Sequence, residues 1–87
     1  MKKKADIEEQ VKKILLKVLK ISDKEFKENI GAYNNPSWDS MNHLEILLSL
    51  EKNFNIKFSQ NEISKLDSFT NIIKIIERKK LNFLWKI

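Results

Sequence analysis

Residues 38–56 read WDSMNHLEILLSLEKNFNI and carry the start and stop signals of a helix. Asp39 and Ser40 are both favoured at the start of a helix, where side-chain oxygens accept hydrogen bonds from free backbone N–H groups. Good helix formers follow them. Asn55 is predicted to end the helix, because asparagine is the commonest substitute for glycine in the left-handed conformation that closes helices. The stretch therefore predicts a helix over residues 40–54.

This predicted helix has two faces, since each residue advances it by about 100°. One arc is apolar and is predicted to face the other helices; it consists of Ile46, Leu47, Leu50 and Phe54. Met41 and Leu48 fall roughly opposite, beside Glu45 and Lys52, and are predicted to be partly exposed. Two residues lie at the boundary, Leu44 and Glu51. An apolar pair with charges around it often marks a partner site, although single exposed apolar residues occur on every protein.

Apolar residues at helical spacing predict further helices on both sides of this one. The first covers residues 5–20 and carries Ile7, Val11, Ile14, Leu15, Val18 and Leu19 on one stripe. The last covers residues 68–80 and carries Phe69, Ile72, Ile73, Ile75 and Ile76. A short helical turn is predicted over residues 60–65. Three substantial helices and a short one predict an all-α fold packed as a bundle.

Two connecting segments lack helical periodicity. Residues 21–39 contain the only glycine and the only proline, and are predicted to form a long loop. A loop of this length needs anchors in a compact domain, and those predicted are Phe26, Ile30 and Tyr33. Ile56 and Phe58 alternate as in a strand, but no second strand is available to pair with them. We expect both to anchor a loop.

Length and composition limit the possible functions. A chain of 87 residues fits a single domain, here predicted over 1–87 with its core at about 5–80 and an apolar extension at 81–87. No apolar run approaches the roughly 20 residues of a membrane span. The absence of cysteine and the single histidine argue against disulfides and metal sites. Acidic residues soon after the N-terminal lysines argue against an export signal, so the predicted location is cytoplasmic.

The net charge of +5 raises the alternative of a basic helical module that binds nucleic acid. The charge is concentrated at the ends of the chain: residues 1–20 carry seven lysines and three acids, and residues 68–87 carry five bases and one acid. The middle, 38–67, carries three lysines and five acids. The lysines of the first helix lack the aromatic residues or recognition helix of such modules, so we interpret them as a solvated face.

The central stretch resembles the motif of acyl carrier proteins. The matching residues are Trp38-Asp39-Ser40-Met41, Leu44-Glu45, Leu50-Glu51 and Phe54-Asn55-Ile56, which follow an Asp-Ser-Leu start, an amphipathic helix and a Phe-Gly-Ile-like end. The resemblance covers about residues 5–79, with four helices in the right order, a long first loop and a short third helix. It implies a four-helix bundle of the acyl carrier protein type.

The resemblance also implies a function. Ser40 matches the serine that receives 4'-phosphopantetheine from coenzyme A through a phosphopantetheinyl transferase, and the arm then carries acyl or aminoacyl groups as thioesters, as in fatty acid or polyketide biosynthesis. A helix N-terminus, with its free N–H groups and positive dipole end, suits the resulting phosphodiester. Asp39 is implied to orient the serine. The implied role is that of a non-enzymatic carrier, predicted to be monomeric, whose partners are the transferase and the loading and acyl-transfer enzymes.

The implied partner face includes five positions that match the family motif, Met41, Glu45, Leu48, Glu51 and Ile56. Leu44, at the boundary between the two faces of the helix, is added to them. The chain departs from the family in being basic, with Asn42 and Lys52 where acids are common and Asn55 where glycine is usual. Docking to a basic partner surface is therefore expected to be weaker or tuned to a dedicated partner. Trp38-Asp39-Ser40-Met41 followed by Asn42-His43-Leu44 resembles specialised carriers more than the housekeeping fatty-acid carrier.

Two further features leave alternatives open. His43 lies three residues after Ser40, which raises the possibility of a Ser-His hydrolase. The sequence shows no third group to orient the ring and no oxyanion hole, so we expect His43 instead to face solvent near the arm.

The apolar tail, residues 81–87, either continues the last helix and packs Phe83 or Trp85 against the first helix, or forms a hydrophobic contact with a partner or a second copy.

Overall fold

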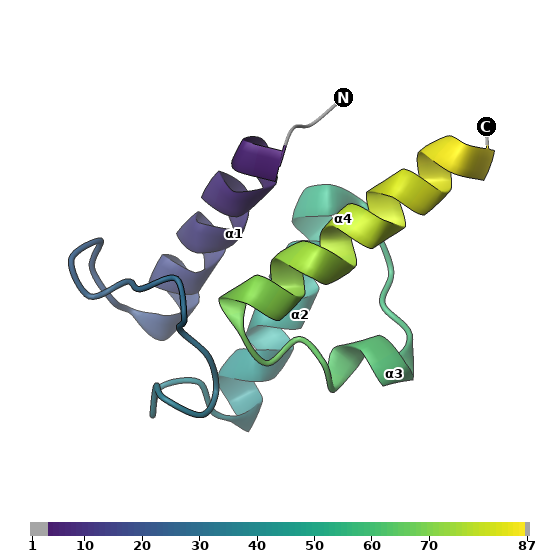
Figure 1. The fold of residues 1–87 in the computed structure, drawn as a ribbon. Coiled ribbons are helices and arrows are strands. Elements are labelled where there is room, and N and C mark those ends of the chain that lie inside the picture. Colours follow the sequence, from purple (N-terminus) through teal and green to yellow (C-terminus); the bar gives the residue numbers. More distant parts are fainter. Residues whose placement is uncertain (1–3, 87) are drawn as a thin grey trace.

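The computed structural model describes the backbone of residues 4–86 and the side chains of residues 6–80. Within that range the chain forms helices and no β-strand, which confirms the all-α prediction (Figure 1). The helices are α1 (Lys4–Leu19), α2 (Ser40–Phe54), α3 (Gln60–Ile63) and α4 (Phe69–Lys86). None of them is long and apolar enough to cross a lipid bilayer.

The helix boundaries follow local signals. α2 has the bounds that the sequence predicts, and α1 ends at Leu19 because Lys20 adopts the left-handed conformation with φ 57°. α3 is shorter than predicted; it begins with a capping box in which Ser59 and Glu62 each accept a backbone N–H of the other. α4 continues to Lys86, beyond the predicted end at residue 80. The side chains of the tail, including Phe83 and Trp85, lie outside the described residues.

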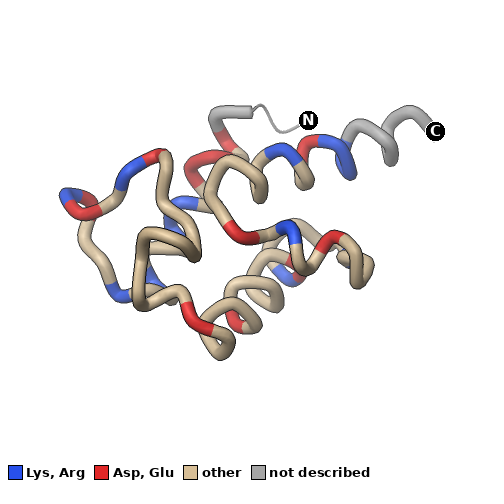
Figure 2. The backbone as a smooth tube through the Cα atoms, turned by 60° about the horizontal axis from the view of Figure 1, so that its bottom comes forward, with Lys and Arg blue, Asp and Glu red and all other residues tan. Residues whose placement is uncertain are grey.

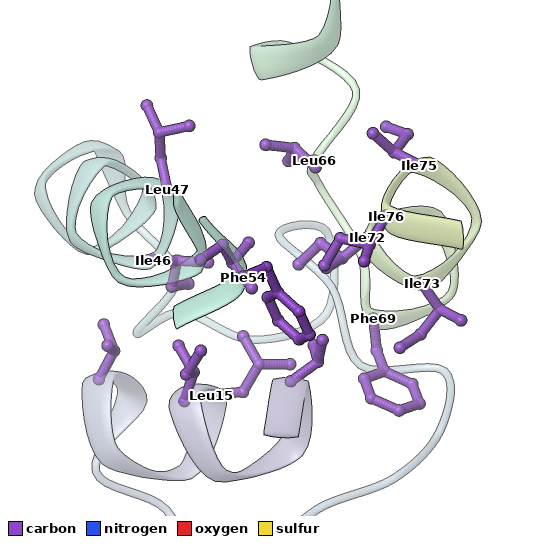
Figure 3. Close-up of a cluster of buried hydrophobic side chains, with 14 of the residues drawn as sticks. Leu15, Ile46, Leu47, Phe54, Leu66, Phe69, Ile72, Ile73, Ile75 and Ile76 are labelled. Atoms are coloured by element: carbon purple, nitrogen blue, oxygen red, sulfur yellow. The ribbon is translucent and has the colours of Figure 1, made fainter. Parts of the chain in front are cut away.

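The core lies where α1 packs against both α2 and α4. Figure 3 shows side chains of these three helices pointing toward one another, with the ring of Phe54 between them. The least exposed side chains are Val11, Leu15, Ile46, Leu50, Phe54, Leu66, Ile72 and Ile76. Each such side chain contributes about 1.5–3 kcal/mol when it leaves water. The inward arc predicted for α2 is confirmed, since all four of its residues are buried.

The long loop before α2 is fixed to the start of α4. Gly31 forms an isolated antiparallel bridge with Ser68, and the backbone N–H of Phe69 donates to the carbonyl of Ile30 at 3.0 Å. Ile30 is buried, and the ring of Phe26 meets that of Phe69 edge-on at 5.1 Å. Two of the three predicted loop anchors are therefore confirmed.

The third predicted anchor, Tyr33, is wrong, because its side chain is 93% exposed. The backbone N–H of Asn34 donates to the carbonyl of Gly31 at 3.2 Å, so Tyr33 stands inside a tight turn at the surface. Trp38, only 5% exposed, anchors the end of the loop in its place. The predicted solvated face of the first helix is confirmed for Lys13, Lys17 and Lys20, which are exposed, whereas Lys12 is half-buried and pairs with Asp23 at 3.0 Å.

The connection after α2 behaves as predicted. Asn55 takes the left-handed conformation, with φ 55° and ψ 52°, and its backbone N–H donates to the carbonyl of Glu51. Phe58 is buried and Ile56 is half-buried, so both anchor this loop. The loop then leads into α3, which lies to one side of α2 and α4 (Figure 1).

Candidate functional site

The start of α2 is built by Asp39. This residue has extended backbone angles, and its Oδ1 accepts the backbone N–H of Asn42 at 2.9 Å, as a helix cap does. The side-chain amide of Asn42 in turn donates to the carbonyl of Ser37 at 2.6 Å. The segment that leads into the helix is thus held to its first turn. The Asp39 carboxylate is committed to capping, which is compatible with its predicted role of orienting the neighbouring serine.

Ser40 is the first residue of α2, and its side chain is exposed. Within the described part of the chain, its hydroxyl neither donates nor accepts a hydrogen bond. The helix leaves backbone N–H groups of its first turn unpaired by other helical residues, and these stabilise negative charge nearby. A hydroxyl in this position is open to an enzyme from outside, and a phosphodiester formed on it fits the electrostatics of the helix end.

His43 does not face solvent as predicted. Its ring is half-buried, and Nδ1 accepts the indole N–H of Trp38 at 3.1 Å. Nε2 lies 3.0 Å from the carbonyl oxygen of Ile63, which only accepts, so Nε2 carries the proton. Both ring nitrogens are engaged away from Ser40. His43 therefore has no free nitrogen to act as its base, which removes the Ser-His hydrolase from consideration.

The outer face of α2 runs from Ser40 toward the far end of the helix. Met41 is 82% exposed, Leu44 54% and Leu48 56%. Glu45 is also exposed. The exposure predicted for Met41 and Leu48 is confirmed, and Leu44 joins them on the solvent side. A row of exposed apolar residues that begins beside the candidate attachment point is suited to contact with another protein.

The row ends at a surface hollow of about 350 Å³. Its lining residues are Leu48, Glu51, Lys52, Asn55, Ile56 and Lys57. Glu51 is half-buried, and its Oε2 accepts the backbone N–H of Phe58 at 3.0 Å. The structure thus brings the predicted partner residues Leu48, Glu51 and Ile56 together, and Glu51 also holds the loop that carries Ile56.

Two features of the site were not predicted from the sequence. The first is the contact of Trp38, His43 and Ile63; its one sequence signal is a tryptophan five residues before the single histidine. The second is the lysine-lined side of α2, where Lys52 faces α1. The described residues contain no cluster of three or more His, Cys, Asp or Glu side chains able to hold a metal ion.

Known proteins match this chain over most of its length. The chain is 31% identical over 78 residues to an acyl carrier protein of Akkermansia muciniphila, covering 83% of this chain and 90% of the relative. It is 29% identical over 76 residues to an acyl carrier protein of Buchnera aphidicola from Acyrthosiphon pisum, and the match covers 87% of this chain and 95% of that protein. For an acyl carrier protein of Chlamydia muridarum the identity is 27% over 74 residues, covering 85% and 96%. No protein-family profile matches the chain.

Proposed function

Because this chain belongs to the acyl carrier protein family, whose members are carriers and not enzymes, we propose that Ser40 holds its 4'-phosphopantetheine arm. The observation that carries the proposal is the exposed hydroxyl at the first position of α2. When bound, the arm supplies a terminal thiol on which cargo is held as a thioester. The chain itself supplies the attachment point and the surface that partner enzymes recognise.

The residues around Ser40 support its modification by a separate enzyme. Asp39 fixes the first turn through Asn42, so the serine is presented at a defined position. The hydroxyl is a poor nucleophile without a base, and the nearby imidazole is engaged with Trp38 and Ile63. A phosphopantetheinyl transferase must therefore supply the base and bring coenzyme A to the protein.

The outer face of α2 is proposed as the surface read by the transferase and by the enzymes that load and unload the arm. Its residues are Met41, Leu44, Glu45, Leu48, Glu51 and Ile56. They extend from the attachment point to the hollow at the end of α2, so an enzyme that holds the arm in its active site touches them at the same time. The cargo is an acyl or aminoacyl group, and the place of action is the cytoplasm, with the protein as a monomer.

The test uses the complete absence of cysteine from the chain. After incubation with coenzyme A and a broad-specificity phosphopantetheinyl transferase, any protein thiol belongs to the arm. Titration with a thiol reagent is expected to find one thiol per chain, and none in Ser40→Ala. Ser37→Ala, three residues upstream and also exposed, serves as the matched control and gains the thiol. Equal thiol content in Ser40→Ala and the unchanged protein refutes the attachment site.

A second measurement distinguishes acyl cargo from aminoacyl cargo. The modified protein is offered to enzymes that form acyl thioesters and to enzymes that activate amino acids, and its mass is followed. A mass gain that hydroxylamine reverses identifies a thioester, and the size of the gain distinguishes an acyl group from an aminoacyl group. The alternative of a nucleic-acid-binding module predicts instead salt-sensitive binding of DNA or RNA by the unmodified protein.

A further inference from the structure

A second recess lies on the other flank of α2, between this helix and α1. It measures about 590 Å³ and is lined by Lys13, Ile14, Lys17 and Val18 of α1 and by Glu45, Ser49, Lys52 and Asn53 of α2. The two helices pack directly on each other. Ile14 and Val18 are buried at its base, whereas its charged side chains are exposed. We call this recess the α1–α2 groove.

The α1–α2 groove is positively charged. Three lysines, Lys13, Lys17 and Lys52, face one carboxylate, that of Glu45, which gives a net charge of +2 (3 − 1). None of the four forms an ion pair with another described residue. Figure 2 shows basic and acidic positions next to each other in the long loop and in α4. Three unpaired ammonium groups around one recess favour an anionic occupant.

The spacing of the lysines matches carboxylates on a helix. Lys13 and Lys17 are four residues apart on α1, which places their Cα atoms about 6 Å apart along the helix axis. Glutamates four residues apart on a second helix have the same spacing. The apolar base formed by Ile14 and Val18 suits an aliphatic side chain between those carboxylates.

We propose that the α1–α2 groove binds an acidic helical segment of a partner protein that acts on the arm. This proposal rests on the proposed carrier function and adds the chemistry of the partner. Glu45 belongs to both the groove and the outer face of α2, and Lys52 belongs to both the groove and the hollow at the end of α2. A partner seated on the outer face therefore reaches the groove without a second docking site.

Glu45 and the shape of the groove disfavour other anionic occupants. A continuous phosphate backbone places negative charge against the Glu45 carboxylate, and the lining residues include no aromatic ring on which a base can stack. A membrane surface requires apolar residues that project outward, whereas Ile14 and Val18 are buried. A protein segment can place its carboxylates at the lysines and leave Glu45 opposite an amide or a cation.

The test measures binding of a synthetic helical peptide with glutamates four residues apart and leucines between them. A matched peptide has glutamine in place of each glutamate. Amide shifts of the isotope-labelled full-length protein, before and after attachment of the arm, report where the peptide binds. We expect shifts at Lys13, Lys17 and Lys52 with the glutamate peptide. Because each exposed ion pair is weak, Lys17→Glu and Lys52→Glu are each expected to reduce affinity by about three- to tenfold.

The control variant is Lys74→Glu, an exposed lysine on α4 outside the groove, which leaves peptide affinity within about twofold because distant exposed charges are screened by salt. Equal binding of the glutamine peptide, or unchanged affinity in Lys52→Glu, overturns the proposal. Tighter binding of a single-stranded oligonucleotide or of anionic vesicles at the same lysines overturns the assignment to a protein segment. A protein that accepts the arm at Ser40 but fails these tests retains the carrier function and loses only the partner proposal.

Discussion

The indole N–H of Trp38 donates to Nδ1 of His43 across 3.1 Å, so the last loop residues and the first turn of α2 share one hydrogen bond. The same imidazole donates from Nε2 to the carbonyl of Ile63, the last residue of α3. His43 thereby joins three segments beside the candidate attachment point at Ser40. Both of its ring nitrogens are engaged in these contacts.

Replacement of His43 by leucine leaves the N–H of Trp38 without a partner in a residue that is only 5% exposed. We expect the free energy of unfolding to fall by about 1–3 kcal/mol, as for other buried donors left unpaired. Urea denaturation measures this. In the double variant with Trp38→Phe the hydrogen bond loses both partners, so its cost is expected to be smaller than the sum of the single costs. If the stability loss of the double variant equals the sum of the two single losses, Trp38 and His43 are not coupled.

The bridge between the long loop and α4 requires glycine at position 31. A Cβ added to Gly31 lies 2.8 Å from the carbonyl oxygen of Asp67 and 3.1 Å from Cβ of Ser68. The carbonyl is backbone and accepts from Ala32 at 2.9 Å, so it has little freedom to move. Gly31→Ala is expected to cost about 1–3 kcal/mol of stability, as overpacking does. Thermal unfolding measures the effect.

The adjacent exposed residue gives the control for Gly31. Ala32→Ser adds one atom at the surface and is expected to change stability by less than about 0.5 kcal/mol. An unchanged melting temperature in Gly31→Ala means that the bridge between the loop and α4 is not tight.

A salt bridge of 2.8 Å joins Lys79 of α4 to Glu62 of α3. Partial burial raises the pKa of the Glu62 carboxyl, but hydrogen bonds from Lys79 and from the backbone N–H of Ser59 outweigh it, so the pKa is lowered below 4.5. Because the pKa of Glu62 is lower in the folded state than in the unfolded state, the ionised carboxylate stabilises the protein at pH values above the unfolded-state pKa. This contribution is lost as the pH falls through the folded-state pKa.

Glu62→Gln is therefore expected to reduce stability by up to about 1 kcal/mol at pH 7. The difference from the unchanged protein should shrink as the pH is lowered below 4.5. Urea denaturation at several pH values tests this, with Glu77→Gln on α4 as the control. A difference that is constant between pH 7 and pH 3 contradicts the lowered pKa.

Exposed apolar residues allow a test of the partner face without damage to the core. Met41→Asp places a charge beside Ser40 on the outer face of α2, where the native side chain is 82% exposed. Loss of an apolar contact at an interface costs about 1–2 kcal/mol, so kcat/KM of the phosphopantetheinyl transferase is expected to fall about tenfold. Helix content should be unchanged.

Tyr33→Asp is the matched control for the outer face. This residue is 93% exposed and lies in the long loop. We expect its modification rate to equal that of the unchanged protein. Equal rates for Met41→Asp and Tyr33→Asp mean that the transferase does not read the face of α2.

The sequence predicts α2 well because both of its ends carry local signals. Asp39 caps the start and Asn55 closes the end in the left-handed conformation, and both act through their own backbone neighbourhood. Helical spacing then decides which side chains face inward, so the exposure of Met41 and Leu48 follows from position alone. Local rules of this kind suffice for the bounds and faces of α2, whereas the candidate attachment point at Ser40 follows from the resemblance to the family motif.

Loop anchors and tertiary contacts escape these rules. Residues 21–39 have no period, so nothing in the sequence decides that Ile30 is buried and Tyr33 is exposed. His43 meets Ile63 twenty residues away, and the resulting contact depends on how α3 is placed. The α1–α2 groove arises in the same way, because its lysines come from helices that are adjacent only after folding.

Fragmentation mass spectrometry of the protein, after reaction with coenzyme A and a phosphopantetheinyl transferase, tests whether the exposed hydroxyl at the start of α2 carries the arm. We expect one phosphopantetheine group per chain and fragments that place it on Ser40. A group located on another serine, or an unmodified chain with each transferase tried, contradicts this assignment.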